Sequence, residues 1–157
     1  MAVLSPLWPR ALVLDTTVVA GWVFRESDKA PWAEHIEQWV AGEQVIAYVP
    51  ELFWAEFQHV CGRKLHEQNV DRPRVEQAYR DVEALPLEEV AVLVDLRDAA
   101  WQLRLDLGVG SYDAYFLALA QDQGIEYWTF DGAFCRLAGS DPSVRAMVKL
   151  IGVDALP

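Results

Sequence analysis

The stretch SYDAYFLALAQDQGIEYWTFD, from Ser111 to Asp131, predicts a helix, a turn and a strand, with an acid near each end. Ser111 is a favourable N-cap residue, and the apolar residues that follow predict a helix that is buried on more than one side. Gly124 suits the end of this helix, and the run IEYWTF is typical of a short strand. We therefore expect Asp113 and Asp131 at the edge of a parallel sheet where ligands bind.

The alternation of strand and helix patterns continues through the rest of the chain. Apolar runs predict strands at 11–14, 44–49 and 87–92 and a last edge strand at 146–151. Helical patterns follow, and they lie at 18–24, 28–41, 50–69, from Asp71 to about 82, 95–107 and 132–138. The alternation predicts an α/β fold with a mainly parallel sheet, as one domain over residues 1–157 in which residues 1–10 are a loose lead-in.

Composition and charge limit the function classes. The chain has 157 residues, 53% of them hydrophobic, with a net charge of −11. A protein that binds nucleic acid by charge attraction alone is basic, so either nucleic acid is not the partner or metal ions and a local patch supply the positive field. Cys61 and Cys135 lack metal-site spacing and are expected as reduced, buried thiols. No apolar run is long enough to span a membrane, so a cytoplasmic protein is expected.

Four acids stand where an acid is unusual. Asp15 directly follows the apolar run ALVL, and Asp131 directly follows EYWTF. Asp113 opens an almost wholly apolar helix, and Glu56 lies within FWAEF. Each also has a structural interpretation: a loop cap for Asp15 and Asp131, and a helix-terminal acid for Asp113. Glu56 could lie on the exposed side of its helix, in a salt bridge to Arg63 or Lys64. Together, four such carboxylates favour a site for a hard divalent cation, Mg²⁺ or Mn²⁺.

Hydroxyl and basic side chains accompany these acids. Thr17 lies two residues after Asp15, and Thr129 lies two residues before Asp131. Both hydroxyls could hold a carboxylate or a water at the site, although Thr17 could instead cap a helix and Thr129 could be an ordinary strand residue. The candidates for contacts to RNA phosphates, each of which could equally be a solubilising surface residue, are Arg25, Arg63 and Lys64.

These motifs, in their order, resemble those of PIN-domain proteins. The matching segments are LDTTV, VPELFWAEF, GVGSYDAYFLALA and YWTFDGAF, and the chain is similar in size to the VapC-type toxins of toxin–antitoxin pairs. The resemblance implies a three-layer α/β/α sandwich and an acidic pocket that binds Mg²⁺ or Mn²⁺ and cleaves RNA. It also implies a homodimer that a cognate antitoxin inhibits. Thr17 stands where the family often has Ser or Asn, and the hydroxyl is retained.

The sequence therefore predicts a divalent-metal-dependent endoribonuclease, a hydrolase in which water attacks phosphorus and leaves a 5′-phosphate and a 3′-hydroxyl. Its catalytic and metal-binding residues would be Asp15, Glu56, Asp113 and Asp131. One alternative is a catalytically weak binding module that acts through a protein partner, and another is a phosphatase or DNase with the same pocket. A dinucleotide site is not supported, because Asp113 occupies the third glycine position of the GxGxxG pattern.

Overall fold

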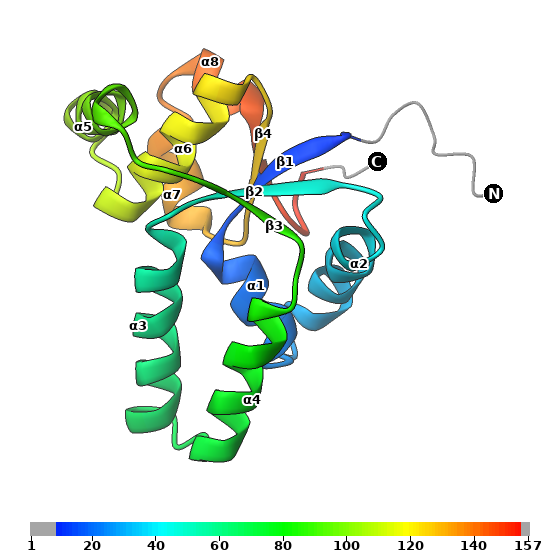
Figure 1. The fold of residues 1–157 in the computed structure, drawn as a ribbon. Coiled ribbons are helices and arrows are strands. Elements are labelled where there is room, and N and C mark those ends of the chain that lie inside the picture. The colour runs from blue at the N-terminus through cyan, green and yellow to red at the C-terminus, as the bar shows by residue number, and fades with distance from the viewer. Residues whose placement is uncertain (1–8, 155–157) are drawn as a thin grey trace.

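The computed structural model describes residues 9–154, which form five strands and eight helices (Figure 1). Residues 1–8 of the predicted lead-in lie outside this part. In chain order the elements are β1 (Ala11–Leu14), α1 (Thr16–Val23), α2 (Ala30–Ala41), β2 (Ile46–Pro50), α3 (Phe53–His66), α4 (Arg72–Glu83), β3 (Leu87–Val90), α5 (Val94–Leu107), α6 (Ser111–Gln123), β4 (Glu126–Thr129), α7 (Gly132–Ala138), α8 (Pro142–Met147) and β5 (Val148–Leu150).

The five strands form one sheet in the order β3-β2-β1-β4-β5, and every neighbouring pair is parallel. The chain first adds strands on one side of β1 and then, from β4 onward, on the other side. The change of direction lies between β1 and β4, where Val13 pairs with Tyr127. In sheets of this kind ligands bind beyond the carboxyl ends of the strands at that point.

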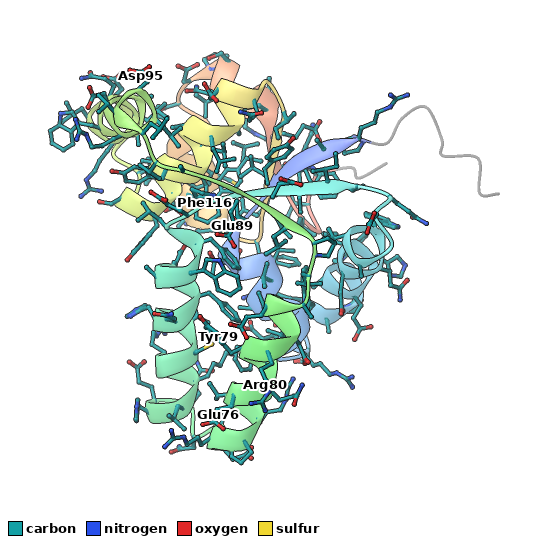
Figure 2. All side chains as sticks on the ribbon, viewed as in Figure 1. Glu76, Tyr79, Arg80, Glu89, Asp95 and Phe116 are labelled. Carbon is teal, nitrogen blue, oxygen red and sulfur yellow. The ribbon has the colours of Figure 1, made fainter. Side chains whose placement is uncertain are left out.

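Helices cover both faces of the sheet, which gives the expected α/β/α sandwich. In Figure 1, α1 to α4 lie on one side of the sheet, and α5 to α8 lie on the other. Within the first layer, α3 and α4 run side by side, and the ring of Tyr79 stacks on Phe57 with 6.0 Å between ring centroids (Figure 2). The prediction of an α/β fold with a mainly parallel sheet is confirmed.

The core lies around the two central strands and α6. Leu12, Val13 and Leu14 of β1 are fully buried, as the continuous apolar run predicts for a strand covered on both faces. The apolar residues of α6 from 116 to 120 are at most 2% exposed, which confirms a helix buried on several sides. Each large apolar side chain buried in this way contributes roughly 1.5–3 kcal/mol to folding. The site described below is therefore built on rigid elements.

Some predicted boundaries are wrong. Pro50 does not begin a helix: it ends β2 and pairs with Val90, a strand-end position that a residue without an N–H tolerates. The following helix, α3, starts at Phe53 and ends at His66 rather than near 69. Ser111 is the first residue of α6 and not its N-cap, which is Gly110. Residues 142–147 form α8, which was not predicted as a helix, so the last strand is shorter than expected.

Other expectations of the sequence are met. Gly108 and Gly124 end α5 and α6 in the left-handed conformation, with φ of 70° and 64°. Cys61 and Cys135 are free and buried. Across residues 9–154, no helix is both long enough and apolar enough to cross a membrane.

Candidate active site

Asp15 is the most buried of the four acids, and two threonine hydroxyls hold its carboxylate. Only 1% of Asp15 is exposed, directly after β1. The Thr129 hydroxyl donates to Oδ2 of Asp15 at 2.6 Å, and the Thr17 hydroxyl donates to the same oxygen. Thr129 in turn accepts a hydrogen bond from the backbone N–H of Asp131 at 2.9 Å. Thr17 does not cap α1, because the N-cap residue of that helix is Asp15.

Glu56 lies in the first turn of α3 and faces the same end of β1. Its Oε2 accepts a hydrogen bond of 2.8 Å from the hydroxyl of Thr16, 40 residues earlier in the chain. The salt bridges considered as an alternative for Glu56 do not form, because Arg63 pairs with Glu67 and Lys64 pairs with Glu26. Sequence reasoning missed Thr16, and the only local signal for it was a hydroxyl residue beside Asp15.

Asp113 is in the first turn of α6, where the positive end of the helix dipole favours a carboxylate. Its side chain bends back toward Gly110. A Cβ atom added to Gly110 would lie 2.9 Å from Oδ2 of Asp113, closer than real Cβ contacts allow. The absence of a side chain at Gly110 therefore gives the Asp113 carboxylate the space that it occupies.

Asp131 combines two roles. It is the N-cap of α7, and its Oδ1 accepts a hydrogen bond of 2.9 Å from the backbone N–H of Phe134. This is the capping role that the sequence offered as an alternative. Its negative charge nevertheless raises the pKa values of Asp15, Glu56 and Asp113, so Asp131 also belongs to the same electrostatic cluster.

The four carboxylates interact strongly with one another. Burial raises the pKa of Glu56 to about 8, and the charge of Asp15 adds to the effect. Burial likewise raises the pKa of Asp113 to about 7, again with a contribution from Asp15. The pKa of Asp15 itself is raised by burial, against the effect of the Thr129, Thr17 and Tyr127 hydroxyls that act on its carboxylate. A bound cation would relieve this repulsion, which otherwise keeps some of the carboxyls protonated near neutral pH.

Tyr127 was missed by sequence reasoning, because a tyrosine in IEYWTF is an ordinary strand residue. It is fully buried on β4, and its hydroxyl is the only buried side-chain polar atom in the described part of the chain that lacks a hydrogen-bond partner. Burial raises the pKa of Tyr127 well above its ordinary value, and the charges of Asp15, Asp113 and Glu56 raise it further. Such a buried, unpaired hydroxyl costs about 1–3 kcal/mol.

The donor chemistry of this cluster fits a hard divalent cation. Its groups are carboxylate and hydroxyl oxygens, which suit Mg²⁺ or Mn²⁺ better than Zn²⁺. The mutual repulsion of the acids and the unpaired Tyr127 hydroxyl both fit a site that is completed by a ligand. Within residues 9–154, however, no three His, Cys, Asp or Glu side chains are arranged as a ready-made metal site.

Two of the three candidate RNA-contacting cations lie near this cluster. Arg63 and Lys64 line a hollow of about 490 Å³ that also includes Thr17, the partner of Asp15, and Lys29. Lys29 and Lys64 both pair with Glu26, at 2.8 and 3.0 Å. Arg25 lines a different hollow of about 330 Å³, with Arg74 and Glu37 among its neighbours. The structure thus groups Arg63 and Lys64 but not Arg25.

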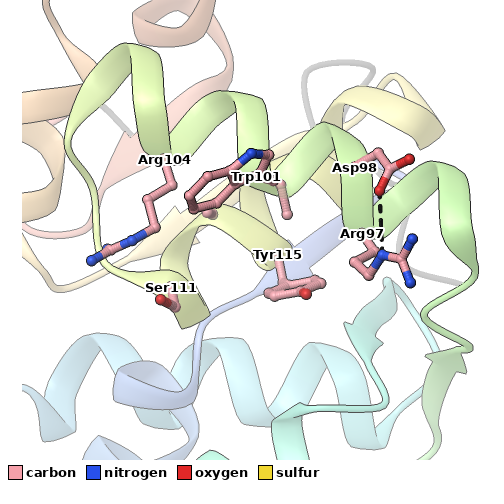
Figure 3. A pocket seen from close by; sticks show the side chains of 8 residues that line it. Arg97, Asp98, Trp101, Arg104, Ser111 and Tyr115 are labelled. Carbon is pink, nitrogen blue, oxygen red and sulfur yellow. Dashed lines mark hydrogen bonds and ion pairs between the residues drawn. The ribbon is translucent and has the colours of Figure 1, made fainter.

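A separate hollow of about 450 Å³ lies between α5 and α6 (Figure 3). Trp101 of α5 and Tyr115 of α6 line it, together with Arg97 and Arg104. Figure 3 shows Arg97 paired with Asp98 at its edge, and the ion pair measures 3.2 Å. None of the four acids lines this hollow, so it is distinct from the acidic cluster.

The comparison with protein families agrees with this geometry. The PIN domain profile matches residues 12–140, a span that includes all four acids. The chain therefore belongs to the PIN domain family. No curated protein sequence matches the chain.

Solved structures support the same fold. A protein from Pyrobaculum aerophilum aligns with a TM-score of 0.65 at 12% identity, over 89% of this chain and 83% of that chain. VapC20 of Mycobacterium tuberculosis, described as a toxin that cleaves the sarcin–ricin loop, aligns with a TM-score of 0.62 at 18% identity. The alignment covers 80% of this chain and 93% of that chain. VapBC2 of Rickettsia felis, solved with a promoter DNA fragment, aligns with a TM-score of 0.59 at 14% identity. The alignment covers 81% of this chain and 92% of that chain.

Proposed function

We propose that this PIN-domain protein is a divalent-metal-dependent endoribonuclease and the toxin of a toxin–antitoxin pair. Family membership supports a nuclease, and the similar structures include the VapBC2 complex, a VapC toxin and a toxin–antitoxin complex from Klebsiella pneumoniae. The observation that carries the proposal is the electrostatic coupling of Asp15, Glu56, Asp113 and Asp131 at the carboxyl ends of β1 and β4.

Purely structural roles do not account for this coupling. Asp131 caps a helix, but Asp15, Glu56 and Asp113 each have a raised pKa, which means that folding disfavours their charged forms. A carboxylate kept only for stability would be expected to have a lowered pKa, as Asp141 has where it caps α8. Stability that is lost in this way at a ligand-binding edge is typical of a functional site.

Within this proposal Asp15 and Asp113 would hold a Mg²⁺ or Mn²⁺ ion directly, and Glu56 and Asp131 would act directly or through water. When bound, the ion lowers the pKa of water and offsets the charge of the phosphodiester. Thr17 and Thr129 keep the Asp15 carboxylate in one orientation. The carboxylates orient a water and accept its proton, the water attacks phosphorus, and the products carry a 5′-phosphate and a 3′-hydroxyl.

RNA would approach along the hollow that adjoins Thr17. Arg63, Lys64 and Lys29 gather there, in a chain whose overall charge of −11 repels nucleic acid. Because phosphate contacts from Lys and Arg supply most of the affinity of such complexes, this local patch is the favoured route for the backbone. Arg25 would contact RNA only outside this hollow.

A homodimer is also proposed, with α5 at the interface. Leu93, Val94, Trp101 and Leu105 are each more than half exposed on or beside this helix. An exposed apolar cluster of this kind is typical of a protein–protein interface. The acidic surface would in turn suit an antitoxin with a basic tail, and the free, buried thiols fit the reducing cytoplasm.

The second candidate function is a catalytically weak binding module that acts through its partner. The lack of a ready-made metal cluster within residues 9–154 is the observation that favours it. The two functions are separated by assaying cleavage of single-stranded and structured RNA in chelator and after addition of Mg²⁺ or Mn²⁺. The nuclease is silent in chelator and active with metal, whereas the binding module cleaves in neither condition. Activity on DNA or phosphomonoesters alone would contradict both.

A further inference from the structure

The hydroxyl of Tyr127 has a fixed position and makes no hydrogen bond of ordinary geometry, although its interaction with the Asp15 carboxylate lowers the pKa of that acid. The tyrosine ring packs between two aromatic rings: it stacks on Phe116 with 5.9 Å between centroids and meets Phe134 edge-on at 5.2 Å. Because the ring is fully buried and held on two sides, the hydroxyl cannot swing out to reach water. Among the described residues it is the one buried side-chain polar atom without a hydrogen bond, so the fold alone does not explain it.

This hydroxyl interacts with the acidic cluster. Tyr127 precedes Thr129 by two positions on β4, so both side chains leave the same face of the sheet, and Thr129 contacts Asp15. The charges of Asp15, Asp113 and Glu56 all act on Tyr127. Since burial and these charges both favour the protonated phenol, its hydroxyl can donate a hydrogen bond to a charged carboxylate.

We propose that Tyr127 is a positioning residue of the acidic site, whose hydroxyl donates to the Asp15 carboxylate, directly or through one water, when the site holds a divalent cation. This inference rests on the proposed function. Thr17 and Thr129 both donate to Oδ2 of Asp15, and Tyr127 would add a donor. Three donors would then fix the carboxylate in the orientation that the cation requires, as outer hydrogen bonds do at other metal sites.

The Tyr127→Phe variant is expected to bind Mn²⁺ more weakly than the parent but to be no less stable without metal. The substitution keeps the ring and its packing on Phe116 and Phe134, and it removes a hydroxyl that makes no hydrogen bond of ordinary geometry in the free protein. The metal-free variant is therefore expected to melt at the same temperature as the parent or higher. In the loaded protein the variant lacks a donor to Asp15, so its dissociation constant for Mn²⁺ is expected to rise about tenfold. If Tyr127 had only a packing role, the substitution would leave the dissociation constant for Mn²⁺ unchanged.

The experiment combines calorimetric titration of Mn²⁺ with thermal unfolding in chelator, for the parent, Tyr127→Phe and Tyr115→Phe. Tyr115 is the matched control, because it loses the same hydroxyl on the α5 side of α6, in the separate hollow. We expect weaker Mn²⁺ binding and unchanged or higher metal-free stability for Tyr127→Phe, and parent-like values for Tyr115→Phe.

Other outcomes overturn the inference. Parent-like Mn²⁺ affinity in Tyr127→Phe would show that its hydroxyl does not act on the site. A variant that is less stable in chelator, or does not fold, would show that the hydroxyl serves the free protein instead. If the parent itself binds no Mn²⁺, the proposed function fails as well, which distinguishes that failure from a failure of the role of Tyr127 alone.

Discussion

The hydroxyl of Thr129 donates to Oδ2 of Asp15 over 2.6 Å, between residues that are 114 positions apart in the chain. The bond joins the ends of β1 and β4, the neighbouring strands between which the order of strands along the sheet reverses. The same hydroxyl accepts a hydrogen bond of 2.9 Å from the backbone N–H of Asp131. Thr129 thus ties together two acid-bearing strand ends beneath the proposed active site.

Replacing Thr129 by valine is expected to damage both stability and activity. Valine keeps the shape but removes a hydrogen bond to a buried carboxyl, so the free energy of unfolding should fall by about 1–3 kcal/mol. The misaligned Asp15 should slow RNA cleavage at saturating Mn²⁺ by at least about tenfold. Chemical denaturation and single-turnover cleavage measure the two effects. Thr129→Ser, which keeps the hydroxyl, should recover most of both, and a fully active valine variant would contradict the role assigned to Thr129.

The metal-free protein should lose stability as the pH rises from about 5 to 8. Glu56 and Asp113 have pKa values of about 8 and about 7 in the folded protein, against ordinary values of 4.5 and 3.8. In this range the folded protein retains protons that the unfolded chain has released, so stability is highest below the ordinary pKa values and falls as the pH passes the folded ones. Melting temperatures in chelator should therefore decrease across this range.

The Glu56→Gln variant isolates this pH effect. It should flatten the pH dependence of the melting temperature, because a neutral amide has no charge for folding to disfavour. Glu76→Gln is the control, since Glu76 is an exposed residue on α4 that forms an ion pair with Arg72 (Figure 2). Equal slopes in the parent and Glu56→Gln would show that Glu56 does not have a raised pKa.

Arg63→Ala is expected to weaken RNA binding without lowering stability. Arg63 lines the hollow beside Thr17, and its own ion pair with Glu67 is exposed, so the pair contributes little to folding. Loss of one phosphate contact should raise KM several-fold and reduce the dependence of binding on salt. Arg72→Ala removes an equivalent exposed pair, with Glu76 on α4, outside the hollow, and serves as the control. Equal KM values for the two variants would argue against this route for RNA.

Trp101→Glu should convert the proposed dimer into a monomer. Trp101 is 55% exposed on α5, within the apolar cluster proposed as the interface, and a glutamate there would bring a charge into that apolar contact. Light scattering coupled to size exclusion gives the mass of each species. Trp32→Glu is the matched control, because Trp32 is 47% exposed on α2. A parent that is already monomeric, or a Trp101→Glu variant that remains dimeric, would contradict an α5 interface.

Local signals in the sequence were enough to place the four acids at one edge of the sheet. Asp15 and Asp131 end apolar runs, and an acid that ends a buried strand can be recognised without any tertiary information. Asp113 was recognisable in the same way, as the acid that begins a buried helix. The α/β class followed from the alternation of strand and helix patterns.

What the sequence could not provide were contacts between distant residues. The hydrogen bond from Thr16 to Glu56 spans 40 positions, and neither residue indicates the other. Tyr127 carries no local sign that its hydroxyl would be buried without a hydrogen bond. Pro50 is typical of the first turn of a helix, but its pairing with Val90 places it in β2, so tertiary structure overrides its local preference.

The central claim is that Asp113 and the acids around it form a metal-dependent catalytic site. The most direct test is a calorimetric titration of Mn²⁺ into the parent and Asp113→Asn, with RNA cleavage assayed on the same samples. Asparagine keeps the size of the side chain but removes its charge, so we expect a folded variant in which Mn²⁺ binding and cleavage are both lost. A folded Asp113→Asn variant that binds Mn²⁺ and cuts RNA as the parent does would contradict the account.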